Sequence, residues 1–458
     1  MKLTKDRLLA LISQEITNSI GFYGGNLTEQ RRNALKYYLG EPMGNEVTGQ
    51  SQVVSQDMLE VVENILPSMM RVFTQGEKIV RFEPTGPEDV EYAEQATDFI
   101  NHIFNVDNNG YAILHTMFKD ALISKNGFVK YYWKTTKEQK KEYYENLTEP
   151  EYQALLADPE VEIIEVDEKG KELDIENTDF SEVVFNVRVK RIKDYGRVVI
   201  ESVPPETILV TSTATSLDDC NFIGQRVFKT RSELINMGFD KKIIDKLPPA
   251  DQDLYNNEAV TRRAYDDADM PQEYQNIDPA LTVVQVVDCY MKCDYDNDGI
   301  AELRHIVVGG NGANAYYVLE NEEIEQIPFA MVSPVPMPHK FYGLSMYDLI
   351  GDIQQVKTTL LRQILNNAYL QNNSRNIVVD GQANIDDLLT SRAGGIVRVK
   401  SPNAVTPMTT PNFMQEGLAM IDKVDQIREA RSGVTKMQMG LDPDIINKSH
   451  TTATSTNV

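Results

Sequence analysis

The sequence predicts an α+β protein, and three patterns along the chain support this. Apolar residues recur at steps of three and four through most of residues 1–126, which is the spacing of amphipathic helices. Over residues 182–211 the period changes to two, as in half-buried β-strands. Two long helical runs then follow, at residues 345–372 and 412–431.

Helices are expected throughout the first 126 residues. The stretch MKLTKDRLLALISQEI mixes charges with apolar residues, which indicates an amphipathic helix and not a signal peptide. Asn26 and Glu29 have the spacing of a capping box, so a helix that includes RRNALKYYLG is expected to start there. Further helices are predicted at Gln56–Phe73, where Pro67 should introduce a kink, at Glu88–Phe104 and at Tyr111–Lys125.

Strands dominate the middle of the chain. Gly127 opens the aromatic-rich strand FVKYYWKT, and residues 137–181 form an acidic, peripheral insertion with a short helix near Glu149–Ala157 and the alternating piece VEIIEV. The segments VVFNVRVKRI and GRVVIESV are expected to form a hairpin that turns at residues 193–196. Short helices are then predicted at 231–237 and 241–246, and strands at 282–293, 300–308 and 315–319.

The run from Ser345 to Asn372 predicts one helix about 40 Å long at 1.5 Å per residue. One face of this helix is apolar, and the face opposite to it is polar but carries few charges. Because an amphipathic helix of this length is stabilised mainly by packing, neighbours are expected along it. The predicted apolar face consists of Leu349, Ile353, Val356, Leu360, Ile364, Leu365 and Ala368.

A compact unit and a returning helix follow. In residues 373–411, NIVVD and GIVRVK are predicted strands, and Asn384 is expected to cap the short helix IDDLL. The second long helix should start at Asn412 and end at Gly433, so that the two helices form an antiparallel stalk with a tip. Its predicted faces are Met414, Leu418, Ile421, Val424, Ile427 and Arg431 on one side, and Asp422, Lys423, Asp425, Arg428 and Glu429 on the other.

The chain has 458 residues and a formal net charge of −24. Residues 339–458 hold 12 Lys and Arg against 11 Asp and Glu, so the acidity belongs to residues 1–338. Such a surface repels nucleic acid at long range, which argues against a high-affinity DNA-binding protein. No apolar run is long enough for a membrane span. The three cysteines, Cys220, Cys289 and Cys293, are expected to be buried thiols in a reducing compartment.

The segment Asp294–Glu302 has the acids and the glycine of the start of an EF-hand calcium loop, but His305 stands where the loop's final Glu would be. Two interpretations stay open. One is a hairpin turn that uses Asp, Asn and Gly for their turn chemistry. The other is a weak Ca²⁺ or Mg²⁺ site that pins the hairpin, formed by Asp294, Asp296, Asp298 and Glu302.

Signatures of an enzyme are mostly absent. The sequence contains no G-x-x-x-x-G-K-[ST], no H-E-x-x-H and no G-x-S-x-G motif. The five histidines lie at His102, His115, His305, His339 and His450, without the spacing of metal ligands. We therefore expect neither an ATP-driven motor nor another enzyme.

The core DIQQVKTTLLRQ, followed by an N-N-x-R turn, resembles the start of the stem in portal proteins of short-tailed bacteriophages. The resemblance continues in RVVIESVPPETILV, the DxDxDGIAE hairpin, PHKFYGLSMYDLIGDIQ and SGVTKMQMGLDP, and covers most of the chain except the acidic insertion. It implies a portal fold. The implied parts are a wing at 1–338 with a β-rich part at 182–330, stem helices at 339–372 and 412–432, a clip at 373–411, and a tunnel-loop region at 433–458, after which a longer parent chain is expected to continue.

The resemblance also implies a function. Portal proteins form a homo-oligomeric, dodecameric ring at one capsid vertex of the virion, assembled in the host cytoplasm as the head–tail connector. Double-stranded DNA passes through it without sequence preference during packaging and ejection. The implied partners are the terminase large subunit, tail or adaptor proteins, and capsid and scaffolding proteins; no membrane is implied.

Candidate residues follow from the same resemblance. Lys357, Arg362, Gln355 and Asn366 on the polar helix face are candidates for the DNA channel, although Lys357 and Arg362 would equally suit a neighbouring subunit. Arg375, Arg392, Arg398 and Lys400 are candidates for a docking surface of the clip, or else a solvated tip with salt bridges. Lys436, Met437, Gln438 and Met439 would belong to the tunnel loop.

Two other functions are weighed against the portal. A calcium-stabilised structural or adhesion module, based on the Asp294 motif, predicts a chelator-sensitive monomer. A hydrolase is supported only by chain size, and it predicts a pocket with perturbed carboxylates that no spacing in the sequence indicates.

Overall fold

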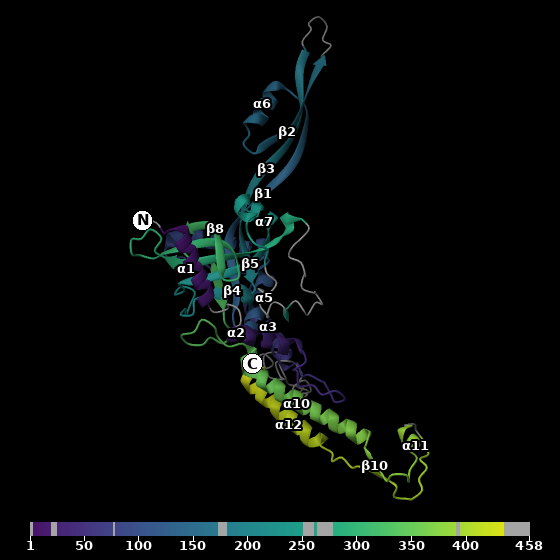
Figure 1. Ribbon diagram of the computed structural model, residues 1–458. Helices are drawn as coiled ribbons and strands as arrows, with labels where there is room; N and C mark the ends of the chain where they lie inside the picture. The colour runs from purple at the N-terminus through teal and green to yellow at the C-terminus, as the bar shows by residue number, and fades with distance from the viewer. Residues whose placement is uncertain are drawn as a thin grey trace. The chain divides into compact units, whose positions relative to one another are not determined.

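The computed structural model describes residues 3–19, 25–76, 78–172, 181–250, 261–262, 278–390 and 394–434. The fold is α+β, as predicted, and the chain forms two compact units (Figure 1). The larger unit consists of Met1–Ile79, Tyr111–Val129 and Ser202–Val458, and the smaller unit of Val80–Gly110 and Lys130–Glu201.

Helices form one core of the larger unit. Its members are α2 (Asn26–Leu39), α3 (Asp57–Thr74), α5 (Gly110–Ser124) and the first turns of α10 (Met346–Asn372). Met58 and Val61 of α3 are buried as the apolar periodicity predicted, and the helix continues through Pro67. The predicted capping box is wrong. Asn26 is already the first helical residue, behind the N-cap Gly25, whereas a capping side chain must come from the non-helical residue before the helix.

An antiparallel sheet forms the second core of this unit. Its strand order is β4 (Ile208–Val210), β5 (Phe222–Thr230), β6 (Val283–Cys293), β7 (Glu302–Asn311) and β8 (Asn314–Glu323). Helix α1 (Lys5–Asn18) packs on it through Leu8, Ile12 and Ile16, and Figure 1 shows α1 beside β8. Leu234 of α7 (Arg231–Asn236) and Ile244 of α8 (Lys241–Ile244) join residues of β6 and β7 in a further apolar cluster.

Several smaller features complete the larger unit. Short 3₁₀ turns lie at Pro205–Thr207 and Pro279–Leu281. Strand β9 (Phe329–Val332) borders β1 (Gly127–Leu147), whose first residues, up to Val129, belong to this unit. The three cysteines are buried and free, as expected.

The described residues of the smaller unit form two α-helices and a long sheet. The first helix is α4 (Val90–His102), between a 3₁₀ turn at Pro87–Asp89 and a π-turn at Ile103–Asp107. The sheet has the order β2 (Val161–Glu172), β3 (Ser181–Val203) and β1 (Gly127–Leu147), and α6 (Glu149–Ala157) lies where a short helix was predicted. The acidic insertion therefore supplies strand residues to this sheet, and Phe185, Val187 and Val189 give the sheet a small buried cluster.

The hairpin predicted at residues 193–196 does not form, because β3 is one continuous strand. Gly196, which suggested a turn, has a different use. A Cβ atom at this position would lie 2.1 Å from Cζ2 of Trp133 on the neighbouring strand β1, so glycine is what lets the indole ring lie against the backbone. The cross-strand contact decided the local structure here, although the composition favoured a turn.

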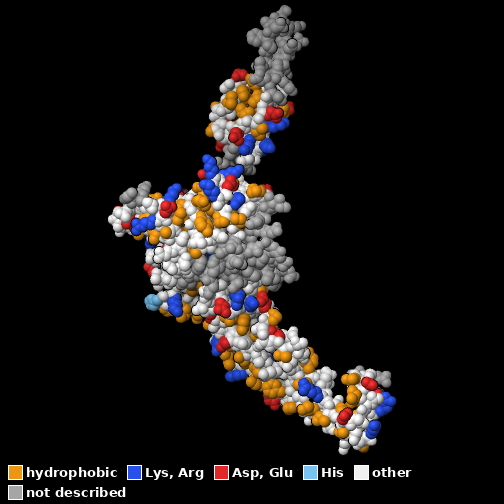
Figure 2. Space-filling model, viewed as in Figure 1, with side chains coloured by type: hydrophobic (Ala, Val, Ile, Leu, Met, Phe, Trp, Pro, Cys, Tyr) orange, Lys and Arg blue, Asp and Glu red, His pale blue; other side chains and the backbone are white. Residues whose placement is uncertain are grey.

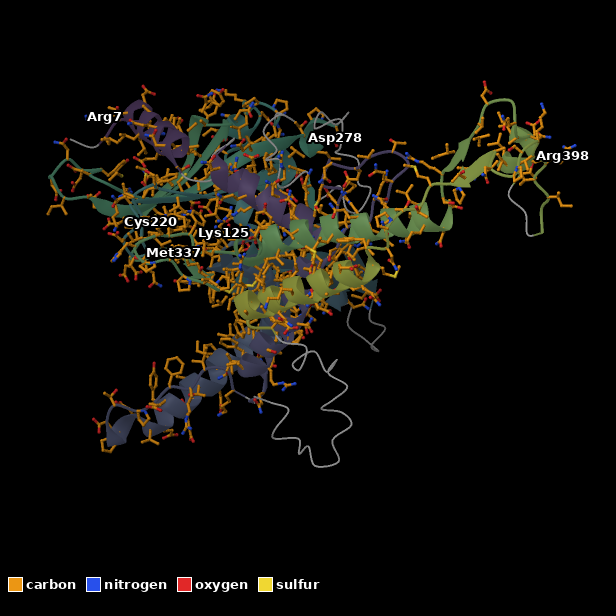
Figure 3. The ribbon with its side chains drawn as sticks, turned by 90° about the horizontal axis from the view of Figure 1, so that it is seen from below. Arg7, Lys125, Cys220, Asp278, Met337 and Arg398 are labelled. Carbon is orange, nitrogen blue, oxygen red and sulfur yellow. The ribbon has the colours of Figure 1, made fainter. Side chains whose placement is uncertain are left out.

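Helices α10 and α12 (Met414–Ser432) lie side by side and antiparallel, as Figures 1 and 3 show. Asp352 meets Arg431 near one end of the pair, and Asn367 meets Phe413 near the other. Both helices have nearly the predicted bounds, and Gly433 follows the end of α12 as expected.

The tip between these helices contains β10 (Asn376–Val378), α11 (Ile385–Leu389) and β11 (Val405–Pro407). The side chain of Asn384 caps α11 by accepting a hydrogen bond from the backbone N–H of Asp386 at 3.1 Å, as predicted. The strand predicted for GIVRVK is wrong. Strand β10 pairs with β11, and within residues 395–400 Val399 makes an isolated bridge to Ala383. Ile396 is 82% exposed, so the alternation there does not mark a buried strand face.

Candidate functional site

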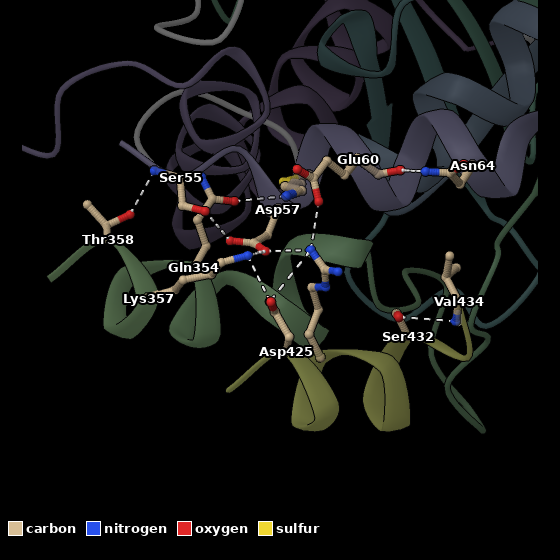
Figure 4. Close-up of polar contacts among 12 residues, drawn as sticks. Ser55, Asp57, Glu60, Asn64, Gln354, Lys357, Thr358, Asp425, Ser432 and Val434 are labelled. Carbon is tan, nitrogen blue, oxygen red and sulfur yellow. Dashed lines mark hydrogen bonds and ion pairs between the residues drawn. The ribbon is translucent and has the colours of Figure 1, made fainter. Parts of the chain in front are cut away.

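A buried cluster of charges joins α3, α10 and α12. Asp57 is fully buried and accepts hydrogen bonds from Lys357 Nζ at 2.8 Å and from the Arg428 guanidinium at 2.6 Å. Lys357 Nζ also donates to Asp425 at 2.7 Å, and Arg428 donates to Glu60 at 2.7 Å. We call these five residues the Asp57 cluster (Figure 4).

The cations keep Asp57 ionised. Burial raises the pKa of Asp57, but the hydrogen bonds from Lys357 and Ser55 and the charges of Lys357 and Arg428 outweigh burial, so the pKa lies below its ordinary value. Burial lowers the pKa of Lys357, whereas Asp425 and Asp57 raise it, and the result lies above the ordinary value. A buried carboxylate held by two cations fixes the relative positions of the three helices that supply them.

Residues 45–55, which we call the strap, run along the polar face of α10. Thr358, Arg362 and Asn366 follow one another at steps of four on that face. Thr358 Oγ1 accepts from the N–H of Ser55 at 3.1 Å, Arg362 Nε donates to the carbonyl of Val53 at 2.8 Å, and Asn366 Oδ1 accepts from the N–H of Ser51 at 2.7 Å. The periodic polar face is thus a row of partners for the strap backbone.

Arg362 also binds the first residues of the strap. Its guanidinium donates to Asn45 Oδ1 at 2.6 Å and to Glu46 Oε1 at 2.5 Å. The hydrogen bond from Arg362 lowers the pKa of Glu46 to about 2. The Arg362 charge is therefore neutralised inside the chain.

Gln354 makes a similar internal contact one turn before Thr358. It is fully buried, its Oε1 accepts from the N–H of Met58 at 2.9 Å, and its Nε2 donates to the carbonyl of Tyr37 at 3.0 Å. Sequence reasoning did not foresee these contacts. Glu46, Asp57 and Tyr37 lie about 300 positions before their partners, and nothing local in the sequence pairs them.

The four residues predicted for the DNA channel therefore differ in their surroundings. Lys357, Arg362 and Asn366 contact the Asp57 cluster or the strap, whereas Gln355 is exposed. A DNA-contact role for these four residues stays a prediction.

The predicted apolar face of α10 is only partly the one that is buried. Leu360 and Ile364 form a small core with Ile421 of α12, but Val356 is 51% exposed. The two helices approach closely at Gly417, where a Cβ atom would lie 2.6 Å from Ile364 Cγ1. Close packing at this glycine leaves room for only a narrow apolar seam.

On α12 the predicted faces are largely wrong. Ile421 and Val424 pack inward as expected, but Leu418 is 52% and Ile427 41% exposed, while Arg428 is only 4% exposed. The physical reason is the Asp57 cluster, because Arg428 must turn inward to reach Asp57 and Glu60. Several apolar side chains of α12 are left on the surface.

The start of α10 is fixed by a polar junction. The Ser345 N–H and hydroxyl donate to Asp348, which forms the capping box of the helix, and Lys125 Nζ donates to Asp348 at 3.1 Å. Asn126 is fully buried, and its side-chain amide donates to the carbonyl of Phe341 at 2.9 Å. The Ser345–Asp348 spacing was a readable signal that sequence analysis missed.

The basic residues predicted for the clip lie on the surface of the tip. Arg398, labelled in Figure 3, donates to Asp387 at 2.8 Å, and Lys400 Nζ donates to the carbonyl of Gly381 at 3.0 Å. Arg375 is exposed, and Arg392 lies outside the described residues. The Arg398 pair fits the interpretation of a solvated tip, and docking stays a prediction.

The acidic motif forms a tight turn between β6 and β7. Asp294, Asp296 and Asp298 each offer a carboxylate oxygen, and these atoms lie within 4.8 Å of one another. The same carboxylates already accept backbone N–H groups of the turn, including Asn297 N–H to Asp294 at 2.6 Å. Glu302 accepts from the N–H of Tyr295 at 3.1 Å. This geometry suits the turn interpretation, and a Ca²⁺ or Mg²⁺ ion bound by these residues stays a prediction.

Some predicted features fall elsewhere. The tunnel-loop residues Lys436, Met437, Gln438 and Met439 lie outside the described residues. Among the helices that the structure describes, none combines the length and the apolar character needed to cross a lipid bilayer.

Comparison with known proteins identifies the family. The family model described as the phage SU10 portal protein matches residues 8–458. No curated protein matches the chain significantly. The match does not support a calcium-stabilised adhesion module, and it names a structural family without a catalytic activity. Because it spans nearly the whole sequence, the chain belongs to the phage SU10 portal protein family and is a bacteriophage portal protein.

Proposed function

We propose that the protein assembles as a dodecameric ring at one vertex of the capsid and that DNA enters and leaves the head through the ring's channel. The role is mechanical and electrostatic. Wing, stem and clip correspond to the segments that the sequence resemblance assigned to them, with α10 and α12 as the stem.

One observation supports assembly above the others, namely the apolar side chains that the two-helix stem leaves exposed. Val356 and Tyr369 on α10 are 51% and 61% exposed, and Leu418 and Met420 on α12 are 52% and 48% exposed. Figure 2 shows hydrophobic side chains spread over the surface of this helix pair. Exposed apolar patches of this kind mark interaction sites, and burial contributes about 25 cal/mol per Å².

The charge pattern of the stem supports a channel that lets DNA slide. Lys357 and Arg362 are neutralised within the chain, and the exposed positions Gln415, Ala419, Gln426 and Ala430 of α12 are uncharged. Each phosphate that a protein neutralises adds to its DNA affinity and to the salt dependence of that affinity. A stem surface with few free cations grips phosphates weakly, as a channel for moving DNA requires.

The exposed tip is the proposed docking surface for the terminase large subunit and later for tail or adaptor proteins. Leu389 and Ile396 are 76% and 82% exposed, next to Arg398. Capsid and scaffolding proteins would contact the wing.

Negative-stain microscopy and mass photometry of the full chain test the assembly. We expect closed rings with a central opening. DNA binding by those rings should be weak, with a shallow dependence of log K on log salt. Uniform monomers at every concentration up to micromolar would contradict the proposal, and a steep salt dependence would contradict the sliding channel.

A further inference from the structure

Helix α12 contacts its own chain along a narrow stripe. The inward positions are Gly417, Ile421 and Arg428, which are all buried, with Val424 and Asp425 half-buried beside them. Most of the remaining positions are exposed. This surface divides into three strips, because successive residues of an α-helix are about 100° apart around the axis.

Two of the strips contain both apolar and charged residues. The Leu418 flank consists of Leu418, Asp422 and the half-buried Glu429, and the Met420 flank consists of Glu416, Met420, Lys423 and Ile427. The third strip, which we call the back, lies between the two flanks and faces away from α10. It consists of Gln415, Ala419, Gln426 and Ala430, which are all exposed and uncharged.

The two flanks complement each other. The Leu418 flank carries the carboxylates of Asp422 and Glu429. The Met420 flank carries the ammonium group of Lys423 near the height of Asp422, and the carboxylate of Glu416 about 10 Å closer to the start of the helix. Their residues also lie at matching heights, because Leu418 and Met420 are about 3 Å apart along the axis, and Asp422 and Lys423 about 1.5 Å apart. If two copies stand side by side in the same orientation, Leu418 faces Met420 and Asp422 faces Lys423.

We propose that α12 closes the ring, with the Leu418 flank of one copy packed against the Met420 flank of the next. This inference rests on the proposed ring and assigns its contact. The contact is heterologous, so it repeats from copy to copy and closes when the rotation between copies allows.

The angle between the flanks decides which side of α12 faces the channel. The centres of the flanks are roughly 150° apart when measured across the back. When the two contact faces of each copy are less than 180° apart, a row of copies curves. The side of each copy that spans the smaller angle then lies on the inside of the curve. The back therefore faces the lumen, and Gln415, Ala419, Gln426 and Ala430 are the residues that meet DNA.

Helix α10 does not offer the same surface. It is covered by α12 on one side and by the strap on the other. Its exposed positions from 352 to 363, which are Asp352, Gln355, Val356, Thr359 and Gln363, form a single strip. One strip supplies one contact face, whereas a heterologous ring needs two. The described part of α10 thus lies behind α12 with respect to the lumen.

Cysteine cross-linking of the full chain tests the contact. The native cysteines are buried, so the variant Leu418→Cys with Met420→Cys carries the accessible pair under test. We expect mild oxidation to yield a ladder of covalent multimers beyond the dimer, because each copy bonds to two neighbours. Each single cysteine variant should yield no ladder. The matched control Ala419→Cys with Gln426→Cys, on the back, should yield none either.

The outcomes separate the inference from the proposed ring. Rings without a ladder from the flank pair, or with a ladder from the back pair, would overturn the inference and leave the ring intact. Dimers from Leu418→Cys alone would overturn it as well, because they show a symmetric contact. Absence of rings from the unaltered protein would overturn the proposed function itself.

Charge reversal gives a second measurement. Asp422→Lys and Lys423→Asp should each lower the fraction of protein in rings at low salt several-fold, and the double variant Asp422→Lys with Lys423→Asp should restore it. Gln415→Lys, on the back, is the control and should leave ring formation unchanged while it steepens the salt dependence of DNA binding. Additive losses in the double variant would overturn the pairing.

Discussion

Helices α10 and α12 are neighbours, yet the chain surrounds them differently. The strap and the Asp57 cluster satisfy the polar side of α10, and its cations are used internally. Helix α12 is held through Arg428, Asp425 and a narrow apolar seam, and much of its surface stays exposed. The comparison teaches that polar and charged groups supply much of the contact within this helix pair, whereas several apolar groups stay exposed and are the ones we propose for the assembly.

The largest effect should come from breaking the Asp57 cluster. Asp57→Ala leaves Lys357 and Arg428 buried without their shared carboxylate, which should cost about 3–5 kcal/mol. The cost can be measured as the opening free energy of α10 and α12 by hydrogen–deuterium exchange. Asp57→Asn keeps the shape of the side chain and provides a second measurement if the alanine variant does not fold.

Asp352→Ala is the matched control for that variant. The Asp352–Arg431 pair joins the same two helices but is exposed, with side-chain exposures of 64% and 47%. Its loss should cost about 0–1 kcal/mol. Equal costs for the two aspartates would contradict the distinction between a buried and a solvated ion pair.

A pair of leucines tests the apolar side of the comparison. Leu360 of α10 is 8% exposed and Leu418 of α12 is 52% exposed. Leu360→Ala should destabilise the subunit by about 2–5 kcal/mol, and Leu418→Ala by no more than about 0.5 kcal/mol. Urea denaturation of the monomer measures both losses of stability. Ring formation should be reduced more by Leu418→Ala than by Leu360→Ala. A large loss of monomer stability in Leu418→Ala would contradict its exposed position.

Acid should release the strap from α10. The pKa of Glu46 in the folded chain is about 2, below the ordinary value of 4.5. The stabilisation is therefore fully present above pH 4.5 and is lost as the pH falls towards 2. Pepsin, which is active in this range, should cleave within residues 45–55 faster as the pH decreases.

Glu46→Gln is the control for the acid effect. The pepsin activity at each pH is first measured on a free peptide with the sequence of the strap, and the cleavage rates are divided by it. The corrected rate for Glu46→Gln should be nearly constant over that pH range. A wild-type rate that is equally constant would show that the Glu46–Arg362 pair does not hold the strap.

The smallest effect should come from calcium at the Asp294 turn. Its carboxylates are exposed or half-buried and already accept backbone N–H groups, unlike the buried Asp57. At about 1 mM Ca²⁺, a site with a Kd of about 1 mM would add about 0.4 kcal/mol of stability. Thermal unfolding with Ca²⁺ and with a chelator measures this, and Asp296→Asn is the control. A shift of several degrees that Asp296→Asn removes would favour the metal interpretation.

Periodicity located most helices and the buried face of α3, but it did not identify the buried faces of α10 and α12 correctly. The bounds of α3, α5, α10 and α12 were close to those expected because the spacing of apolar residues is a local property. The capping box at Asn26, the hairpin at 193–196 and the GIVRVK strand were wrong, since each depends on a neighbour that composition does not reveal. Gly196 illustrates this, because Trp133 on another strand gives it its role.

The sequence by itself determined the fold class, the long helix pair with its tip, and the resemblance that the family match confirmed. Only the tertiary structure decided which face of each helix is buried. Glu46 and Asp57 neutralise Arg362 and Lys357 from about 300 positions away, and Arg428 turns inward to complete the cluster. The physical reason is that a buried charge needs a partner, and a distant partner can reverse the face that local hydrophobicity predicts.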